Sequence, residues 1–400
     1  MLTVDPAVFE ARLGEVEDVL ADEDISALVI YAQGSALGWA GRMHGYLRFL
    51  SDWDSHHYSS VLIVIPGAEP VVLTPNKFLH YLAAERTHLT DVRYAPVLDF
   101  GREIAAVLKA AGLGLGRIGY IGRSETPVPV WEDMVAGLGN AEWIDISHHL
   151  DRMRMVKDEG QLAFHRRAAE ICDKMCEGLD PELRSGKAAY QVSAELERIG
   201  THEGCEYCLT WLTVRPEADC ARLYKRLGAD VPKPGDQVVL GIYLMVDGHW
   251  GHAIRTGNLG PPRDDHQSLF DVTLEMADAG LAKLAPGADL NDVEAAFEAV
   301  FQRHCPDAQE RNIFRFCNAH GLGHSYEEAI VGAAFPQPYA PAPKQEARPD
   351  PIPAQAGMLF EFHPNIFIPG LGGAAIGDMV LVTETGNEIL TRFPRRLSIW

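Results

Sequence analysis

The stretch Pro232–Gly260 constrains this chain most, because it has the pattern of a long β-hairpin. A Pro-Gly-Asp turn precedes an apolar run over residues 238–246, and Asp247-Gly248 is typical of a tight turn between antiparallel strands. The returning strand carries His249 and His252. A hairpin of this kind presents its side chains at a fixed depth inside a sheet, so both histidines are candidates for a site.

Two later segments also carry histidine and also have the pattern of strands or strand edges. Residues 318–328 read NAHGLGHSYEE and contain His320 and His324, and residues 357–365 read GMLFEFHPN and contain His363. If both segments meet the hairpin in the fold, imidazoles from three distant parts of the chain converge on one cavity. The sequence therefore predicts a histidine-rich site.

Composition limits the classes of protein to which the chain can belong. Its 400 residues suffice for two domains, and its formal net charge of −21 disfavours binding to nucleic acid. No apolar run reaches the roughly 18–20 residues of a membrane span, and the N-terminus lacks the pattern of a signal peptide. The seven cysteines favour free thiols in a reducing compartment. We expect a soluble, cytoplasmic protein that binds neither nucleic acid nor membranes.

The coarse secondary-structure pattern changes near residue 151. Before it, helices and strands alternate, which is typical of an α/β domain. After it, a long helical stretch over residues 152–179 is predicted, followed by further helices and strands. The proline-rich residues 335–355 predict a long ordered loop or lid. Residues 48–60, which contain His56-His57, predict a loop that either lies on the surface or reaches a site, including that of a neighbouring subunit.

Five motifs in chain order resemble those of the creatinase, prolidase and aminopeptidase P family, the M24 group. They are RMRMVKDEGQLAFHRRAAEI, PKPGD, HGLGH, PAQAGMLFEFHPNIF and GDMVLVTETGNEILT, and the resemblance covers essentially the whole chain. It implies an α+β fold with a small N-terminal α/β domain over residues 1–150. It also implies a C-terminal pita-bread domain over residues 151–400, and a homodimer in which each N-terminal domain covers the partner's site.

The resemblance also shows where this chain departs from the metallopeptidases of that group, which hold two metal ions with two Asp, one His and two Glu. The first Asp position falls on Gly241 and the second on His252. The His position is kept as His320, whereas the Glu positions fall on His363 and Gly377. Because two adjacent dications need bridging carboxylates, a dinuclear peptidase site is not supported, and proline-peptide hydrolysis is disfavoured.

Three of those five positions hold histidine: His252, His320 and His363. In the family these positions surround the same metal ion, so the resemblance implies one mononuclear site for Zn²⁺, Fe²⁺ or Mn²⁺ with coordination positions left open. His324 is a candidate fourth ligand or acid/base. The alternative is a metal-free pocket in which histidine alone works as acid and base, as in creatinase.

Further candidates surround this predicted centre. The catalytic His of creatinase falls near Tyr224 and another family His falls on Glu327, so the candidates for proton transfer are His324, Glu327, Glu328 and Tyr224. The candidates for substrate binding are His56, His57, Arg222, Arg255 and His249, although a structural ion pair is the alternative role of Arg255.

The resulting hypothesis is a creatinase-like hydrolase that cleaves a non-peptide C–N bond of a small polar nitrogenous metabolite. The first alternative is a lyase that acts by β-elimination, as the family members that cleave dimethylsulfoniopropionate do. The second alternative is a non-catalytic pita-bread module that binds a partner.

Overall fold

The computed structural model describes residues 4–113, 116–219, 228–328 and 351–400. The chain divides into two compact units. The N-terminal unit comprises residues 1–154 together with the short segment 324–328, and the C-terminal unit comprises residues 155–323 and 329–400. The break after residue 154 lies close to the predicted change of character at residue 151. No pattern in the sequence predicted that residues 324–328 would join the first unit.

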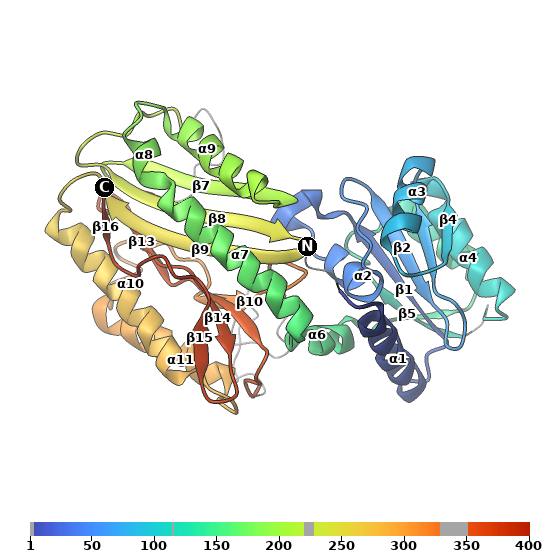
Figure 1. Ribbon diagram of the computed structural model, residues 1–400. Helices are drawn as coiled ribbons and strands as arrows, with labels where there is room; N and C mark the ends of the chain where they lie inside the picture. The colour runs from blue at the N-terminus through green and yellow to red at the C-terminus, as the bar shows by residue number, and fades with distance from the viewer. Residues whose placement is uncertain (1–3, 114–115, 220–227, 329–350) are drawn as a thin grey trace. The chain divides into compact units, whose positions relative to one another are not determined.

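In its described residues, the N-terminal unit contains a six-stranded mixed sheet in the order β4-β3-β2-β1-β5-β6 (Figure 1). The strands are β1 (Ala27–Gln33), β2 (Ser59–Val64), β3 (Val71–Thr74), β4 (Asp91–Tyr94), β5 (Arg117–Ile121) and β6 (Glu142–Asp145). The helices are α1 (Pro6–Asp22), η1 (Ser35–Ala40), α2 (His44–Ser51), α3 (Lys77–Arg86), η2 (Val97–Asp99), α4 (Phe100–Ala110), α5 (Val128–Leu138) and α6 (Ser147–Met155).

The central strand β1 is buried on both faces because its side chains alternate between two cores. Leu28 and Ile30 pack with residues of α1, α2 and α3. Val29 and Tyr31 pack with residues of α4 and α5. Helices therefore cover both sides of this sheet, which explains why its central strands are apolar at nearly every position.

The C-terminal unit is built on two four-stranded sheets and a two-stranded ribbon, counted over its described residues. The first sheet has the order β16-β9-β8-β7, the second the order β10-β11-β14-β15, and the ribbon pairs β12 with β13. Their bounds are β7 (Tyr207–Arg215), β8 (Gln237–Val246), β9 (His249–Asn258), β10 (Ala319–Gly321), β11 (Leu359–Phe362), β12 (Asn365–Ile368), β13 (Gly372–Ala375), β14 (Asp378–Val382), β15 (Asn387–Ile389) and β16 (Ser398–Ile399).

Helices pack against the outer faces of these sheets. The helices are α7 (Glu159–Glu177), α8 (Leu179–Leu183), α9 (Ala189–His202), α10 (Asp264–Lys283) and α11 (Leu290–His304). Residues of α7 and α9 share a core with Leu240, Ile242 and Leu244 of β8, and α7 crosses β8 and β9 in Figure 1. Residues of α10 and α11 share a second core with Phe360 and Phe362 of β11. The inner sheet faces are thereby left to form a site.

Some local predictions differ from the structure. The expected long helix over residues 152–179 is broken, because Asp158 caps the start of α7 in a capping box with Gln161. The expected loop over residues 48–60 begins inside helix α2, whose last residue is Ser51. Most of the expected lid over residues 335–355 lies outside the described residues. The hairpin over residues 232–260 is confirmed as β8 and β9, with Asp247 and Gly248 at positive φ in the turn.

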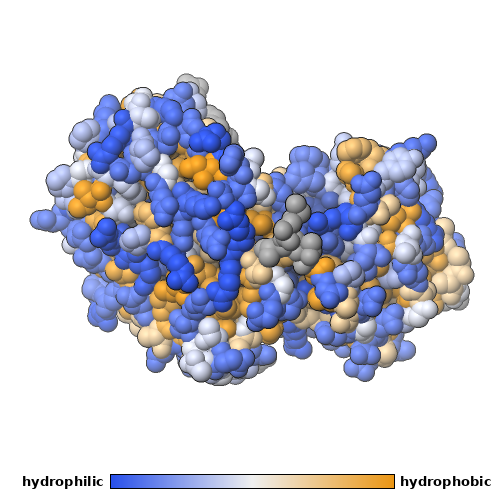
Figure 2. All heavy atoms as spheres, viewed as in Figure 1, coloured by the Kyte–Doolittle hydropathy of each residue, from blue (hydrophilic) through white to orange (hydrophobic). Residues whose placement is uncertain are grey.

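Hydrophilic side chains cover most of the visible face of each unit in Figure 2. Among the described residues, no helix has the length and apolarity that crossing a membrane would require.

Candidate functional site

His252 lies on the inner face of the first sheet. In the β8–β9 ladder it pairs with Tyr243, and the two rings stack with centroids 4.4 Å apart. On the neighbouring strand β7, Trp211 pairs with Gly241, and its ring is nearly parallel to that of Tyr243 at 6.4 Å. Side chains of a strand alternate between faces, so Gly241 and Tyr243 face away from the helix-covered side that Leu240 and Ile242 occupy. The inner face is therefore aromatic around His252.

Glu361 joins His252 and His320 in one cluster. His320 of β10 lies directly opposite Glu361 of β11 in an antiparallel pair. The His320 Nε2 atom is 3.3 Å from Glu361 Oε2, and the same carboxylate oxygen contacts Nδ1 of His252. All three side chains are buried, and Glu361 has no exposed surface. Two strands of one sheet and one strand of the other thus bring two imidazoles and a carboxylate together.

The residues at this centre fit a single divalent metal ion. One ligand atom from each of His252, His320 and Glu361 lies within 4.8 Å of the other two. The His320 Nδ1–H donates to the carbonyl oxygen of Gly321 at 2.9 Å, so Nε2 is the ring atom that faces the Glu361 oxygen. A metal ion or a proton between Nε2 and this oxygen would satisfy both atoms. Two His and one carboxylate are a common ligand set of catalytic metal sites.

His363 lies beside this cluster and has a thiol neighbour. Its ring centroid is 5.1 Å from that of His320 and 6.0 Å from that of His252. Its Nε2 atom is 3.5 Å from Sγ of Cys317. Among the described residues, the group whose ligand atoms all lie within 4.8 Å of one another is His252, His320 and Glu361, so the structure adds Glu361 as a candidate ligand. The metal-binding role of His363 remains a prediction.

Burial keeps these imidazoles neutral near pH 7. Burial and the neighbouring rings of His363 and His320 lower the pKa of His252 well below its usual value. Burial and the His320 ring lower the pKa of His363 in the same direction. Because a neutral imidazole has a lone pair to offer, both rings suit metal ligation or proton acceptance.

Two glycines, Gly241 and Gly377, stand where the resemblance places carboxylate ligands, and the surroundings of Gly377 leave no room for a side chain. At Gly377 a Cβ atom would lie 2.7 Å from the backbone nitrogen of Ile254, because β9 and the start of β14 are joined there by reciprocal backbone hydrogen bonds. At Gly241 a Cβ would already touch the rings of Trp211 and Tyr243. These last distances, 3.5–3.6 Å, are ordinary van der Waals contacts, so the backbone pairing excludes a side chain at Gly377 but leaves room for a Cβ at Gly241.

Comparison with known protein families settles which family this is. Residues 163–384 match the model of metallopeptidase family M24, and residues 12–156 match the creatinase/prolidase N-terminal domain. This chain belongs to the M24 family. The expected α+β fold, with a small N-terminal domain and a pita-bread domain, is confirmed.

Relatives of this M24 protein include both creatinase and proline peptidases. It is similar to a creatinase of a Bacillus species, with 24% identity over 74% of this chain and 71% of that protein. It is also similar to an Xaa-Pro dipeptidase of Pyrococcus horikoshii, with 22% identity over 84% of this chain and 87% of the relative. The crystal structure of an X-Pro aminopeptidase from Thermotoga maritima superposes with a TM-score of 0.77 at 19% identity, covering 97% of this chain and 99% of that one. Identities this low establish the fold but not the substrate.

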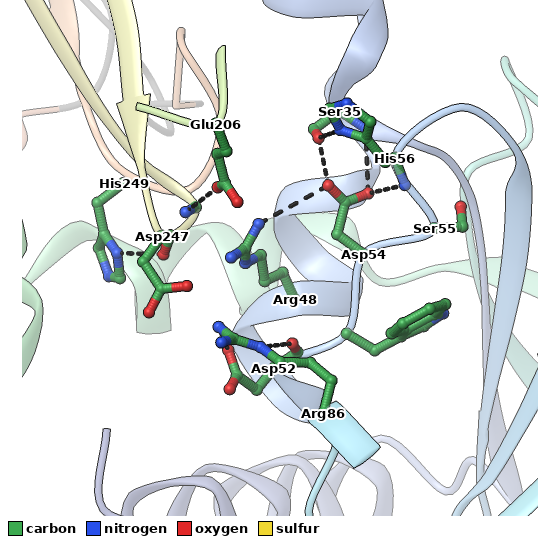
Figure 3. A network of polar contacts seen from close by, with 12 residues as sticks. Ser35, Arg48, Asp52, Asp54, Ser55, His56, Arg86, Glu206, Asp247 and His249 are labelled. Carbon is green, nitrogen blue, oxygen red and sulfur yellow. Dashed lines mark hydrogen bonds and ion pairs between the residues drawn. The ribbon is translucent and has the colours of Figure 1, made fainter. Parts of the chain in front are cut away.

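Two of the expected substrate-binding residues on β9 do not join His252. The His249 ring stacks on Phe164 of α7 at 4.7 Å, and its Nδ1 hydrogen-bonds the carbonyl oxygen of Asp247 (Figure 3). Arg255 is buried and donates to the carboxylate of Asp378 at 2.8 Å. These contacts favour a packing role for His249 and the structural ion pair for Arg255, and the substrate-binding roles of both remain predictions.

The expected acid/base candidates in residues 324–328 make their described contacts within the N-terminal unit. Glu328 forms a buried ion pair with Arg154 at 2.9 Å and also accepts from the backbone nitrogen of His324. The His324 ring meets Phe49 edge-on at 6.3 Å. Burial raises the pKa of Glu327 to about 7, against the opposing effect of Arg42, so this carboxyl is poised for proton transfer near neutral pH. The catalytic roles of these three residues remain predictions.

The segment that carries His56 and His57 is held within its own unit. Asp54 accepts from Ser35 and from the backbone nitrogen of His56, and its carboxylate lies 3.7 Å from Arg48 (Figure 3). Burial alone would raise the pKa of Asp54, but the positive charge of Arg48 and the hydrogen bonds hold it below its usual value. His57 is exposed. The substrate-binding roles of both histidines remain predictions.

Tyr224 and Arg222 lie outside the described residues. Sequence reasoning missed Glu361, Cys317 and Trp211. A signal for Glu361 was present, because residues 361 and 363 lie two apart in an extended segment and share a face. For Cys317 and Trp211 only the tertiary contacts reveal a place near the centre.

A buried carboxyl behind the centre predicts a pH effect on stability. Burial raises the pKa of Glu294 in α11 to about 7, although Asn318 donates to it at 3.0 Å. The folded state therefore binds a proton that the unfolded state has lost above about pH 4.5, so stability falls as the pH rises toward and past 7. Glu294→Gln removes the titrating group and with it this loss of stability. We expect the substitution to leave the free energy of unfolding nearly unchanged at pH 5 and to raise it by on the order of 2 kcal/mol at pH 8. This figure is reduced because part of the side chain reaches water.

The measurement is urea unfolding of both proteins at the two pH values. The exposed Glu310→Gln serves as the matched control and should change stability equally at both. A Glu294→Gln variant whose effect is independent of pH would contradict the assignment.

Proposed function

We propose that this M24 protein is a hydrolase that cleaves a non-peptide C–N bond of a small polar nitrogenous molecule. The centre formed by His252, His320 and Glu361 carries the proposal, because it suits one metal ion instead of the two of the peptidases. Gly241 and Gly377 support the same view, since they stand at positions where the resemblance places carboxylate ligands, and at Gly377 the backbone of Ile254 leaves no room for a side chain.

His252, His320 and Glu361 would hold the ion, for which Zn²⁺, Fe²⁺ and Mn²⁺ are the candidates. Such an ion acts as a Lewis acid that polarises a substrate oxygen and lowers the pKa of water toward about 7. The protein supplies the geometry: the Gly321 carbonyl fixes the ring of His320, and Tyr243 stacks on His252.

His363 is the proposed proton carrier of the reaction. Its ring adjoins those of both proposed histidine ligands, and burial favours its neutral form, so the ring can accept a proton from the attacking water. The resulting imidazolium would then donate that proton to the departing nitrogen. In the metal-free version of the proposal the same imidazole is the general acid and base, as expected for a creatinase-like pocket.

Metal content separates the two versions. We expect purified protein to contain about one divalent ion per chain, in line with a mononuclear catalytic site. Elemental analysis measures the amount, and the visible absorption of a Co²⁺-substituted sample reports the coordination. Far less than one ion per chain, with activity unaffected by a chelator, would exclude the metal version.

A substrate panel tests the reaction class. Creatine, N-carbamoyl amino acids and simple amides should include a compound that is hydrolysed, with one oxygen atom taken from ¹⁸O-labelled water. Ala-Pro and Gly-Pro should remain intact, with or without added Mn²⁺. Efficient Xaa-Pro cleavage would contradict the proposal and indicate a proline peptidase, the activity for which many of its relatives are named. An alkene product without ¹⁸O would favour the lyase.

Two further expectations belong to the same proposal. The protein is expected to be cytoplasmic and to form a homodimer, as the resemblance implies. Light scattering of the purified protein measures the second directly.

A further inference from the structure

A pocket of about 510 Å³ is lined by residues of the C-terminal unit. One wall contains Arg215, the last residue of β7, with Glu217 and Asp219 just after it, and the other wall contains Phe314 together with Phe367 of β12. This volume lies within the usual range for small-molecule sites. None of the residues of the histidine and glutamate centre lines this pocket.

The second wall is aromatic and held in place. The backbones of Phe314 and Phe367 exchange two hydrogen bonds, at 2.9 and 3.0 Å, and their ring centroids are 6.2 Å apart. The ring of Phe316 packs edge-on against that of Phe314, with centroids 4.9 Å apart. Even so, Phe314 remains 45% exposed. A large apolar ring that is fixed and yet left open to solvent is suited to stack against a bound group.

The charges at the rim occur as opposite pairs. Arg215 lies 3.2 Å from Asp219, and Glu217 lies 3.7 Å from Arg263. Paired charges largely cancel each other's field at a distance, so the described rim favours neither an anion nor a cation. The described charges around this pocket therefore favour a neutral group of a bound molecule.

The pocket is connected to the histidine and glutamate centre by a continuous line of rings. Phe367 stacks on Trp211 at 6.5 Å, Trp211 lies parallel to Tyr243 at 6.4 Å, and Tyr243 stacks on His252 at 4.4 Å. The buried indole Nε1 of Trp211 has no hydrogen-bond acceptor among the described residues. This line places the pocket and the centre on the same sheet face.

Gln237 fixes the two walls to each other. Its side-chain oxygen accepts from the backbone nitrogen of Ala218 at 3.0 Å and from that of Gly373 at 3.1 Å. The side chain is fully buried. Walls joined in this way lose little freedom when a ligand enters, which favours affinity.

We propose that this pocket binds a neutral planar ring of the substrate while the scissile C–N bond lies at the histidine and glutamate centre. The inference rests on the proposed function and narrows its substrate class to a nitrogenous molecule that carries an aromatic or conjugated ring. The ring stacks on Phe314 and Phe367, and the polar end extends along Trp211 and Tyr243.

Binding of three probes tests the proposal without any need for turnover. Benzamide carries a neutral ring, acetamide lacks the ring, and benzamidinium carries the ring with a charge. We expect saturation-transfer NMR and calorimetry to show benzamide binding at least about tenfold more tightly than acetamide and no more weakly than benzamidinium. Phe314→Ala should weaken benzamide binding by about tenfold. Phe314→Leu, which keeps the apolar volume and protects the fold, should weaken it less.

Phe78→Ala is the matched control, because this phenylalanine is 69% exposed on α3 of the other unit. It should leave benzamide binding unchanged. His252→Ala should abolish any hydrolysis and yet retain benzamide binding, so a failure of the proposed function can be told apart from a failure of the pocket. Equal binding of benzamide and acetamide, unchanged benzamide binding by Phe314→Ala, or a tenfold preference for benzamidinium would each overturn the proposal.

Discussion

Glu361→Gln is expected to lower both metal affinity and hydrolytic activity by at least about 100-fold, since even the loss of an outer partner of a metal ligand costs 10–100-fold. The side chain is fully buried, and one of its oxygens contacts both His252 and His320. Glutamine keeps the size and shape of the side chain but removes its negative charge. The expected loss therefore arises from the ligand set and not from a cavity in the core.

Cobalt binding measures this effect independently of the substrate. Wild-type protein should bind Co²⁺ with an absorption spectrum typical of mixed nitrogen and oxygen ligands, and Glu361→Gln should bind it at least about 100-fold more weakly. The exposed Glu384→Gln of the same unit is the matched control and should bind Co²⁺ as wild type does. If Glu361→Gln retained wild-type affinity, the ion would have to lie elsewhere.

The proposed third ligand, Glu361, shows what the sequence could and could not predict. His252 and His320 were predicted because family motifs fix their positions along the chain. The same motifs drew attention to His363, whereas the structure places Glu361 directly opposite His320 in the ladder. Which of two side chains on one face comes within reach of a metal depends on register, and register is a tertiary property.

Strand periodicity would have separated the residues of β9 in advance. His249 and Arg255 each lie three positions from His252, and an odd spacing in a strand places two side chains on opposite faces. The structure follows this rule, since His249 packs on α7 while His252 stacks on Tyr243. The domain pattern and most helices were predictable because long apolar periodicities are local. The association of residues 324–328 with the first unit is not local and left no pattern in the sequence.

Replacement of Arg255 is expected to produce the largest loss of stability. The residue is 1% exposed, and its guanidinium donates to the carbonyl oxygens of Ile254, Gly377 and Phe393 as well as to Asp378. Arg255→Met keeps much of the apolar stem but removes one of the two guanidinium groups that lie 2.8 Å from the buried Asp378 carboxylate, the other being that of Arg395. Removal of one partner of a buried ion pair costs about 3–5 kcal/mol, and we expect a loss of that size in urea unfolding of the C-terminal unit.

Two controls make the stability measurement specific. Arg392→Met removes an arginine whose side chain is 77% exposed and which lies 3.8 Å from Glu388, and should cost less than about 1 kcal/mol. In the Asp378→Asn background, Arg255→Met should lower the free energy of unfolding by less than in wild type. The reason is that residue 378 then carries no buried charge that loses its partner. An equal cost in both backgrounds would show that the carbonyl contacts, and not the ion pair, carry the stability.

The Arg255–Asp378 ion pair lies between the strands that carry the residues of the histidine and glutamate centre. Arg255 holds β9, which carries His252, to Gly377 and Asp378 at the start of β14. Strand β14 pairs with β11, where Met379 lies opposite Glu361. Loss of Arg255 should therefore loosen the register between His252 and Glu361 before the unit unfolds. We expect Arg255→Met to weaken Co²⁺ binding by about tenfold under native conditions, the size of effect expected for an outer partner, whereas Arg392→Met leaves it unchanged.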